Sequence, residues 1–236
     1  PDPHSFVRDV AEVLDPEGLW ILEQADIGSI LQSNAFDTIC HEHLEYYGTR
    51  QLQRLLGAHG LRIFDIQFNH SNGGSSRIFA CHETAPFRPN ELALAGSDAR
   101  DSDLALTDMA TYQRFSDRVV QLRDKLCAFL RDVHDAGGLV HIYGASTKGN
   151  TLLQYCGIDN SIIAAASERN PMKWGRRTPG TNIPIISEEE SRVSNPDYLL
   201  VLPWHFRDEF IERECDYINS GGHLVFPLPE FSVYPN

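Results

Sequence analysis

Histidine, glutamate and tyrosine side chains crowd into one short segment, FDTICHEHLEYYG, residues 36–48. In chain order these side chains are His41, Glu42, His43, Glu45, Tyr46 and Tyr47. An imidazole can exchange a proton near neutral pH, a carboxylate can orient it, and a phenol can donate to a developing oxyanion. The residue types therefore fit an acid/base site.

A metal site and a purely polar loop are the alternatives for this segment. If the segment is extended, His41 and His43 point to one side and Glu42 to the other. A metal would then need a third ligand, and the HExxH spacing of zinc proteases is absent. The candidates for that third ligand are Glu45, His59 and His82. The other alternative is a polar loop whose histidines are satisfied by hydrogen bonds, while an acid/base site requires fewer further residues than a metal site.

A second candidate site is the turn GASTKGN, residues 144–150, between an apolar strand pattern and a helical pattern. Backbone N–H groups and the helix dipole attract anions at such a turn. It is not a Walker turn, because Lys148 precedes the second glycine and Asn150 follows it. The alternative to anion binding is a tight turn with Ser146 or Thr147 as the helix N-cap.

A third candidate site is the basic segment ERNPMKWGRRTPG, residues 168–180. It contains Arg169, Lys173, Arg176 and Arg177. The segment follows a strand pattern, so we expect it at the carboxyl edge of a sheet, where such folds bind ligands; a solvated loop is the alternative. The segment PWHF, residues 203–206, also follows a predicted strand. We therefore expect His205 or Trp204 at the same carboxyl edge of the sheet; the alternative is that Trp204 packs in the core.

Composition limits the classes of function. The chain has 236 residues, 42% of them hydrophobic and 22% charged, as in ordinary globular proteins. Its net charge of −13 disfavours nucleic acid and anionic membranes as partners. Five widely spaced cysteines without a CxxC pair indicate neither a disulfide framework nor a cysteine zinc site. Without a membrane-length apolar run or a signal peptide, we expect a cytoplasmic protein with reduced thiols.

The first part of the chain has the pattern of helices and strands that ends in a hairpin. We predict helices over 5–14 and 49–59 and strands over 19–23, 61–68 and 75–83. The turn between the last two strands is rich in Asn and Gly, which favours an antiparallel hairpin. This order resembles the second half of a class I methyltransferase domain, without its glycine-rich cofactor turn.

The rest of the chain alternates strands and helices after one long helix. We predict an irregular linker over 86–102 and a spacer helix over 103–135, packed between two domains and ending at Gly137-Gly138. The alternating elements are strands over 139–144, 161–167, 183–186, 198–203 and 223–229, with helices over 147–156 and 204–218. Such alternation predicts an α/β fold with a doubly wound, Rossmann-like sheet. The predicted parts are 1–85, 86–136 and 137–236.

Five phrases of the chain, in order, resemble those of the S-adenosylmethionine-dependent sugar C-methyltransferases, which act on nucleotide-linked keto-deoxysugars. They are FDTICHEHLEYYG, GGSSRIF, YGASTKGNTLLQY, ERNPMKWGRRTPGT and VLPWHF, and they span nearly the whole chain. The resemblance implies a zinc-binding module, a central cofactor domain and a C-terminal α/β domain that helps to hold the nucleotide-sugar. We expect this chain to be the back of the central domain plus the C-terminal domain, with the zinc module and the cofactor glycines ahead of Pro1.

The resemblance also implies roles for residues. His43 matches the catalytic base, with Glu42 orienting it and His41 beside it, and Cys40 stands where the family usually has Tyr. Expected contacts to the nucleotide-sugar are Tyr46, Tyr47, Arg77, Ser146, Thr147, Lys148, Asn150, Glu168, Arg169, Lys173 and His205. No residue is assigned to S-adenosylmethionine or to a metal. A non-catalytic nucleotide-sugar-binding module and a metal-dependent hydrolase built on His41 and His43 are the alternative functions.

Overall fold

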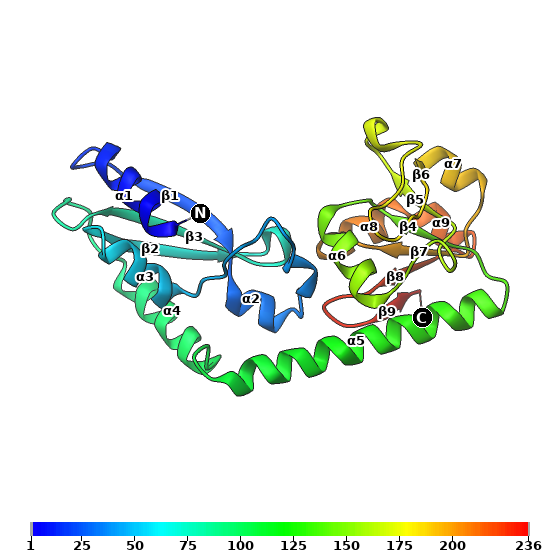
Figure 1. The fold of residues 1–236 in the computed structure, drawn as a ribbon, viewed down its shortest axis with the longest axis horizontal. Coiled ribbons are helices and arrows are strands. Elements are labelled where there is room, and N and C mark those ends of the chain that lie inside the picture. The colour runs from blue at the N-terminus through cyan, green and yellow to red at the C-terminus, as the bar shows by residue number, and fades with distance from the viewer. Residues whose placement is uncertain (1, 236) are drawn as a thin grey trace. The chain divides into compact units, whose positions relative to one another are not determined.

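Residues 2–235 are described by a computed structural model, which contains two compact units (Figure 1). The N-terminal unit consists of the residues up to Gln32 together with Glu45–Arg114. The C-terminal unit is formed by Ser33–Leu44 together with the residues from Phe115 onward. Each unit has its own sheet.

The N-terminal unit is built on a three-stranded antiparallel sheet of order β1-β3-β2. Its strands are β1 Trp20–Ala25, β2 Leu61–Asn69 and β3 Ser75–His82, and its first helices are α1 Pro3–Val13, α2 Ile27–Gln32 and α3 Thr49–Gly57. The predicted hairpin of β2 and β3 is confirmed. Helix α2 was not predicted, because its six residues are too few to establish a period.

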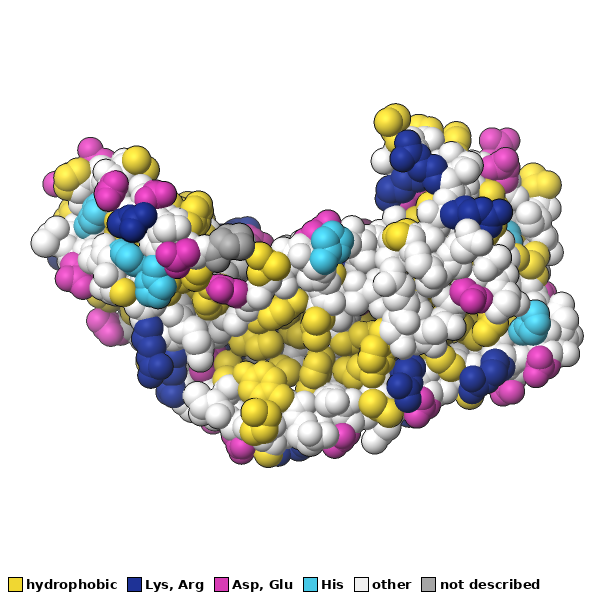
Figure 2. All heavy atoms as spheres, viewed as in Figure 1, with side chains coloured by type: hydrophobic (Ala, Val, Ile, Leu, Met, Phe, Trp, Pro, Cys, Tyr) yellow, Lys and Arg dark blue, Asp and Glu magenta, His cyan; other side chains and the backbone are white. Residues whose placement is uncertain are grey.

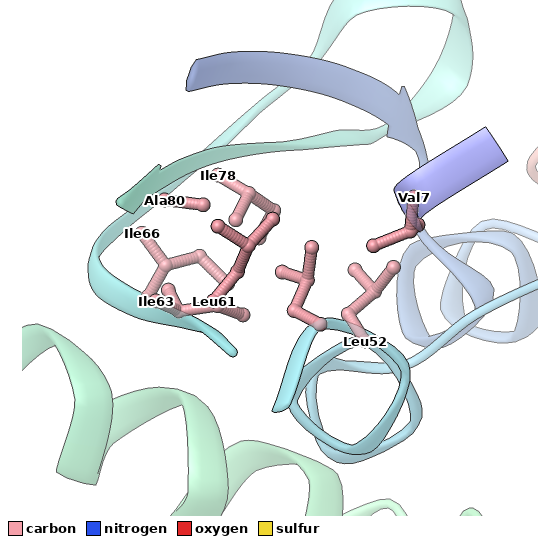
Figure 3. Packing of buried hydrophobic residues seen from close by; sticks show 8 residues of the cluster. Val7, Leu52, Leu61, Ile63, Ile66, Ile78 and Ala80 are labelled. Carbon is pink, nitrogen blue, oxygen red and sulfur yellow. The ribbon is translucent and has the colours of Figure 1, made fainter. Parts of the chain in front are cut away.

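The core of the N-terminal unit lies between α3 and the sheet. Leu52 and Leu56, four residues apart on α3, form one buried cluster with Ile63 and Ile66 of β2 and Ile78 of β3. Figure 3 shows Leu52 on the helix side of this cluster and the three isoleucines on the strands. Leu56 and Ile78 are almost completely inaccessible to solvent. The apolar face of α3 therefore fixes this helix on the hairpin.

The predicted irregular linker over 86–102 is wrong. Most of it is helix α4, Glu91–Asp103, which packs against β2. Its N-cap is Asn90, whose side chain accepts the N–H of Ala93 at 3.2 Å. The buried side of α4 includes the polar residues Ser97 and Asp101, so the sequence lacks the apolar stripe that would predict a helix here.

The long helix α5, Met109–Asp135, begins later than predicted. Ala105 adopts a left-handed φ of 50°, and a turn separates α4 from α5. In the C-terminal unit the ring of Phe129 on α5 contacts the rings of Tyr198 and Phe231. The helix ends at the predicted glycines, where Gly137 has a φ of 79° and the N–H of Gly138 bonds to the carbonyl of Val133 at 2.9 Å.

The sheet of the C-terminal unit has the order β6-β5-β4-β7-β8-β9 and is parallel except for β9. Its strands are β4 Val140–Tyr143, β5 Ala165–Glu168, β6 Ile185–Ser187, β7 Tyr198–Val201, β8 His223–Phe226 and β9 Ser232–Tyr234. Its other helices are α6 Thr147–Cys156, α7 Glu188–Val193, α8 Arg207–Arg213 and α9 Cys215–Asn219. The predicted doubly wound sheet is confirmed. Strand order reverses between β4 and β7, which makes their carboxyl ends the topological switch point.

Two predicted elements of this unit differ most from their predicted limits. The helix expected over 204–218 is divided into a 3-10 turn, Trp204–Phe206, then α8 and α9, with the break at Glu214. The buried Glu214 carboxylate accepts the Tyr143 hydroxyl at 2.7 Å and pairs with Arg192 at 2.9 Å. Strand β5 begins at Ala165 rather than 161. The preceding chain turns at Asp159, whose side chain accepts the N–H of residue 161 at 2.8 Å.

Segment Ser33–Leu44 packs with the C-terminal unit, although its neighbours in sequence belong to the other unit. Asn34 donates to the carbonyl of Pro229 at 3.0 Å, and the ring of Phe36 lies 5.2 Å from that of Tyr155. The boundaries of the two units thus differ from the predicted boundaries at residues 85 and 136. The three-part division by sequence stays a prediction.

Candidate active site

The HEH residues lie on a turn rather than on an extended segment. The N–H of Ile39 bonds to the carbonyl of Phe36 at 3.0 Å, and the N–H of His43 bonds to that of Cys40 at 3.0 Å. His41 and Glu42 are exposed at the corner of this turn, and His43 is half-buried. The strand-like alternation that would place His41 and His43 on one side is therefore wrong. We call residues 40–43 the HEH turn.

A buried carboxylate precedes the HEH turn by three residues. Asp37 is 2% exposed, and the indole N–H of Trp204 donates to its Oδ2 at 2.9 Å. Burial raises the pKa of Asp37, while the Trp204 hydrogen bond and the charge of Lys148 oppose this change. Trp204 is itself buried, as the core alternative for this residue predicted.

Lys148 and His205 belong to the same group of side chains as Asp37. Lys148, in the first turn of α6, interacts electrostatically with Asp37 and Cys40, and burial lowers its pKa. Burial and the charge of Lys148 lower the pKa of His205 to about 4, so the imidazole is neutral at physiological pH. The Nδ1 atom of His205 is buried, and it has no hydrogen-bond partner among residues 2–235.

A cavity of about 480 Å³ opens at the carboxyl ends of β4, β5 and β7. It therefore lies beside the switch point, where open α/β sheets bind ligands. Its walls include Gly144, Ser146, Glu168, Arg169, Lys173 and Pro203. Four of the predicted contact residues thus meet at one cavity. Lys148 interacts with Asp37 instead, and His205 with Lys148.

The wall between β4 and β5 is held together by Glu168. Its carboxylate accepts the N–H of Ala145 at 3.1 Å, the N–H of Asn170 at 3.0 Å and the ammonium of Lys173 at 3.0 Å. Lys173 also donates to the carbonyl of Ala145 at 2.8 Å. Burial would raise the pKa of Glu168, but these hydrogen bonds hold it below its usual value. The carboxylate is thereby kept charged and fixes the turn after β4.

The turn after β4 needs both of its glycines. Gly144 has a φ of 89°, and a Cβ on Gly149 would lie 2.5 Å from Cδ1 of Leu202. The Ser146 side chain accepts the N–H of Gly149 at 3.1 Å, which confirms the predicted N-cap. Thr147 is exposed and Asn150 half-buried in the first turn of the helix.

The basic residues of the 168–180 segment lie along an exposed loop after β5 (Figures 1 and 2). The side chain of Arg169 is 73% exposed, and its Nε lies 3.9 Å from a carboxylate oxygen of Glu188. Arg176 and Arg177 are exposed. Dark blue Lys and Arg side chains gather at this end of the C-terminal unit in Figure 2. Of these basic residues, Arg169 and Lys173 line the cavity, and each has a glutamate partner there, Glu188 and Glu168.

Tyr46, Tyr47 and Arg77 belong to the N-terminal unit. Tyr47 donates to Glu45, and burial together with that carboxylate raises the pKa of Tyr47 to about 12. Arg77, on β3, pairs with Glu23 at 2.7 Å, so its guanidinium already has a partner. Their part in substrate binding stays a prediction.

Sequence reasoning missed several residues at the cavity and the HEH turn. Asp37 stands in the FDTICHEH phrase, but nothing in that phrase predicts that its side chain is buried. The others are Tyr143, Glu188, Phe206, Glu209, Phe210 and Arg213, which also line the cavity. Phe206 could have been found from the sequence, because it lies shortly after a predicted strand and such positions line the carboxyl edge of the sheet.

The metal interpretation of His41 and His43 finds no third ligand. Over residues 2–235, no group of three or more His, Cys, Asp or Glu side chains could hold a metal ion. No helix in the same range is long and apolar enough to cross a membrane. The five cysteines are free thiols.

Comparison with known proteins shows which protein family this chain resembles. A family model described as "C-methyltransferase C-terminal domain" matches residues 70–229. The C-methyltransferase NovU of Streptomyces niveus is 35% identical over 235 residues, which are 98% of this chain and 54% of that protein. The chain thus spans about half the length of the curated relative that it matches.

Proposed function

Because the chain belongs to the family defined by the C-methyltransferase C-terminal domain, we propose that it is the C-terminal portion of an S-adenosylmethionine-dependent enzyme that methylates a carbon of a nucleotide-linked keto-sugar. The observation that carries this proposal is the placement of the HEH turn. It packs in the same unit as the switch-point loops, which supports a ligand that would contact both.

The cavity at β4, β5 and β7 would take the nucleotide diphosphate. The first turn of α6 offers backbone N–H groups and the positive end of the helix dipole to phosphate. Arg169 and Lys173 line the cavity and add positive charge. Lys148 and the neutral His205 would contact the sugar side of the ligand, near the HEH turn.

His43 would act as the base. Methylation next to a ketone requires removal of a weakly acidic C–H proton, which an imidazole within hydrogen-bond reach can accept. Glu42 would orient the imidazole, and His41 would lie beside the sugar. The negative charge that develops on the keto oxygen needs a donor or cation, and Lys148 is the cation that interacts with the start of the turn.

S-adenosylmethionine supplies the methyl group from its sulfonium centre when it is bound. We assign none of the described residues to it. This chain's residues would hold the sugar, remove the proton and stabilise the resulting enolate, while proximity of the carbon and the methyl donor supplies much of the acceleration. The cytoplasm stays the proposed location.

Solvent exchange of the α-proton tests the role of His43. In deuterated buffer the complete enzyme should exchange the proton next to the ketone, and His43→Asn should slow this exchange about 100-fold or more. His134→Asn, at an exposed position near the end of α5, is the matched control and should exchange at the wild-type rate. A wild-type rate in His43→Asn would contradict the assignment. A complete enzyme that binds nucleoside diphosphate but transfers no methyl group would favour the non-catalytic binding module.

A further inference from the structure

Asp37 takes no direct part in the proposed chemistry, yet it connects three segments at the switch point. It lies in the 3-10 turn Phe36–Thr38, just before the HEH turn. Trp204, which binds its Oδ2 at 2.9 Å, comes from the loop after β7. Lys148, which interacts with it electrostatically, comes from the first turn of α6. The segments that follow both central strands, β4 and β7, thus interact with one carboxylate.

The path from Asp37 to His43 is short and hydrogen-bonded. The N–H of Cys40 bonds to the carbonyl of Thr38 at 2.9 Å, and the N–H of His43 bonds to the carbonyl of Cys40 at 3.0 Å. Consecutive turns of this kind leave the backbone few alternatives. A displacement of the Asp37 side chain would therefore move the HEH turn with it.

Stability alone does not account for a carboxylate in this position. A buried charge is unfavourable unless it is paired, and an apolar side chain of similar size often stabilises a protein as well or better. The carboxylate instead provides orientation-dependent interactions, because it accepts the indole N–H of Trp204 and attracts the ammonium of Lys148. A defined geometry at the HEH turn is the property that these two partners provide.

We propose that Asp37 is a positioning residue that holds the HEH turn beside the switch-point loops through Trp204 and Lys148. The consequence for His43 rests on the proposed function, whereas the effect on the turn does not. Two variants separate the contributions of charge and hydrogen bond. Asp37→Asn keeps an acceptor oxygen for Trp204 and removes the charge, and Trp204→Phe removes the donor and keeps the charge.

Hydrogen exchange in the full chain, followed by mass spectrometry, measures the turn directly. We expect amides of residues 39–44 to exchange about tenfold faster in both variants, because a buried polar group has lost a partner. Amides of β4 should keep their rates, which excludes general destabilisation. Asp132→Asn, an exposed carboxylate on α5, is the matched control and should change neither region.

Kinetics of the complete enzyme provide the second measurement. Trp204→Phe should lower the kcat of α-proton exchange about tenfold and leave KM within about twofold, since positioning acts on the bound substrate. Unchanged amide exchange in residues 39–44 would overturn the inference. Faster amide exchange with unchanged kcat would uphold the positioning of the turn and contradict His43 as the base. If Asp37→Asn does not fold, Trp204→Phe carries both measurements alone.

Discussion

At the scale of single residues, His205 differs most from an ordinary surface histidine. Burial and the neighbouring Lys148 lower its pKa to about 4. The folded protein therefore keeps a neutral imidazole, whereas the unfolded chain takes up a proton below the usual histidine pKa of about 6.5. The contribution of His205 to stability is fully present above that pH and is lost as the pH falls toward 4.

We therefore predict that His205→Gln reduces the acid sensitivity of the protein. Between pH 7 and pH 4.5 the wild type should lose about 2 kcal/mol of unfolding free energy more than the variant. Urea unfolding at the two pH values measures this difference. An equal loss in both proteins would show that His205 is not the group that takes up the proton.

At the scale of elements, α6 depends on its close approach to Leu202, the residue that follows β7. A Cβ at position 149 would lie 2.5 Å from Cδ1 and 3.1 Å from Cβ of Leu202. Helix propensity alone would favour alanine there by about 1 kcal/mol, so the steric term decides the sign.

We predict that Gly149→Ala lowers the unfolding free energy by about 1–3 kcal/mol, because the first turn of α6 must move away from Leu202. It should also weaken binding of a nucleoside diphosphate if that turn holds the phosphates. Gly96→Ala on α4 is the control, since a Cβ there meets nothing within 4 Å, and it should stabilise the protein by about 0.5–1 kcal/mol. Urea unfolding and calorimetry measure the two effects. A stabilising Gly149→Ala would contradict the steric argument.

At the scale of the whole molecule, the chain crosses between its two units more than once. Segment Ser33–Leu44 leaves the N-terminal unit, packs with the C-terminal unit and returns. Under the proposed function, the HEH turn therefore belongs to the unit that would bind the nucleotide-sugar, and not to the unit that contains β1, β2 and β3.

We predict that this segment opens together with the C-terminal unit. In native-state hydrogen exchange at rising urea concentration, amides of residues 33–44 should follow those of α6 and not those of α3. Opening in step with α3 would contradict this assignment of the segment. Helix α3 begins at Thr49, close in sequence to the end of the segment, so different behaviour of the two would not follow from sequence distance.

The sequence determined most of the regular elements and the sheet of the C-terminal unit. Helix α6 begins and ends where Ser146 and Gly157 predict, since caps are local features that a few residues encode. The β2–β3 hairpin and the alternation of buried strands with helices are equally local. The family is likewise encoded in the five phrases, because each is a continuous run of residues that can be compared without knowing how the chain folds.

Only the tertiary structure decided where the chemistry-bearing side chains meet. Asp37 and Trp204 are separated by 167 positions, and no local pattern predicts their hydrogen bond. The polar inner side of α4 and the buried Glu214 that divides α8 from α9 are understood only through their partners. The HEH residues looked compatible with a strand because spacing alone does not reveal a turn. Periodicity reports which face a neighbour will cover, whereas the identity of that neighbour is fixed by folding.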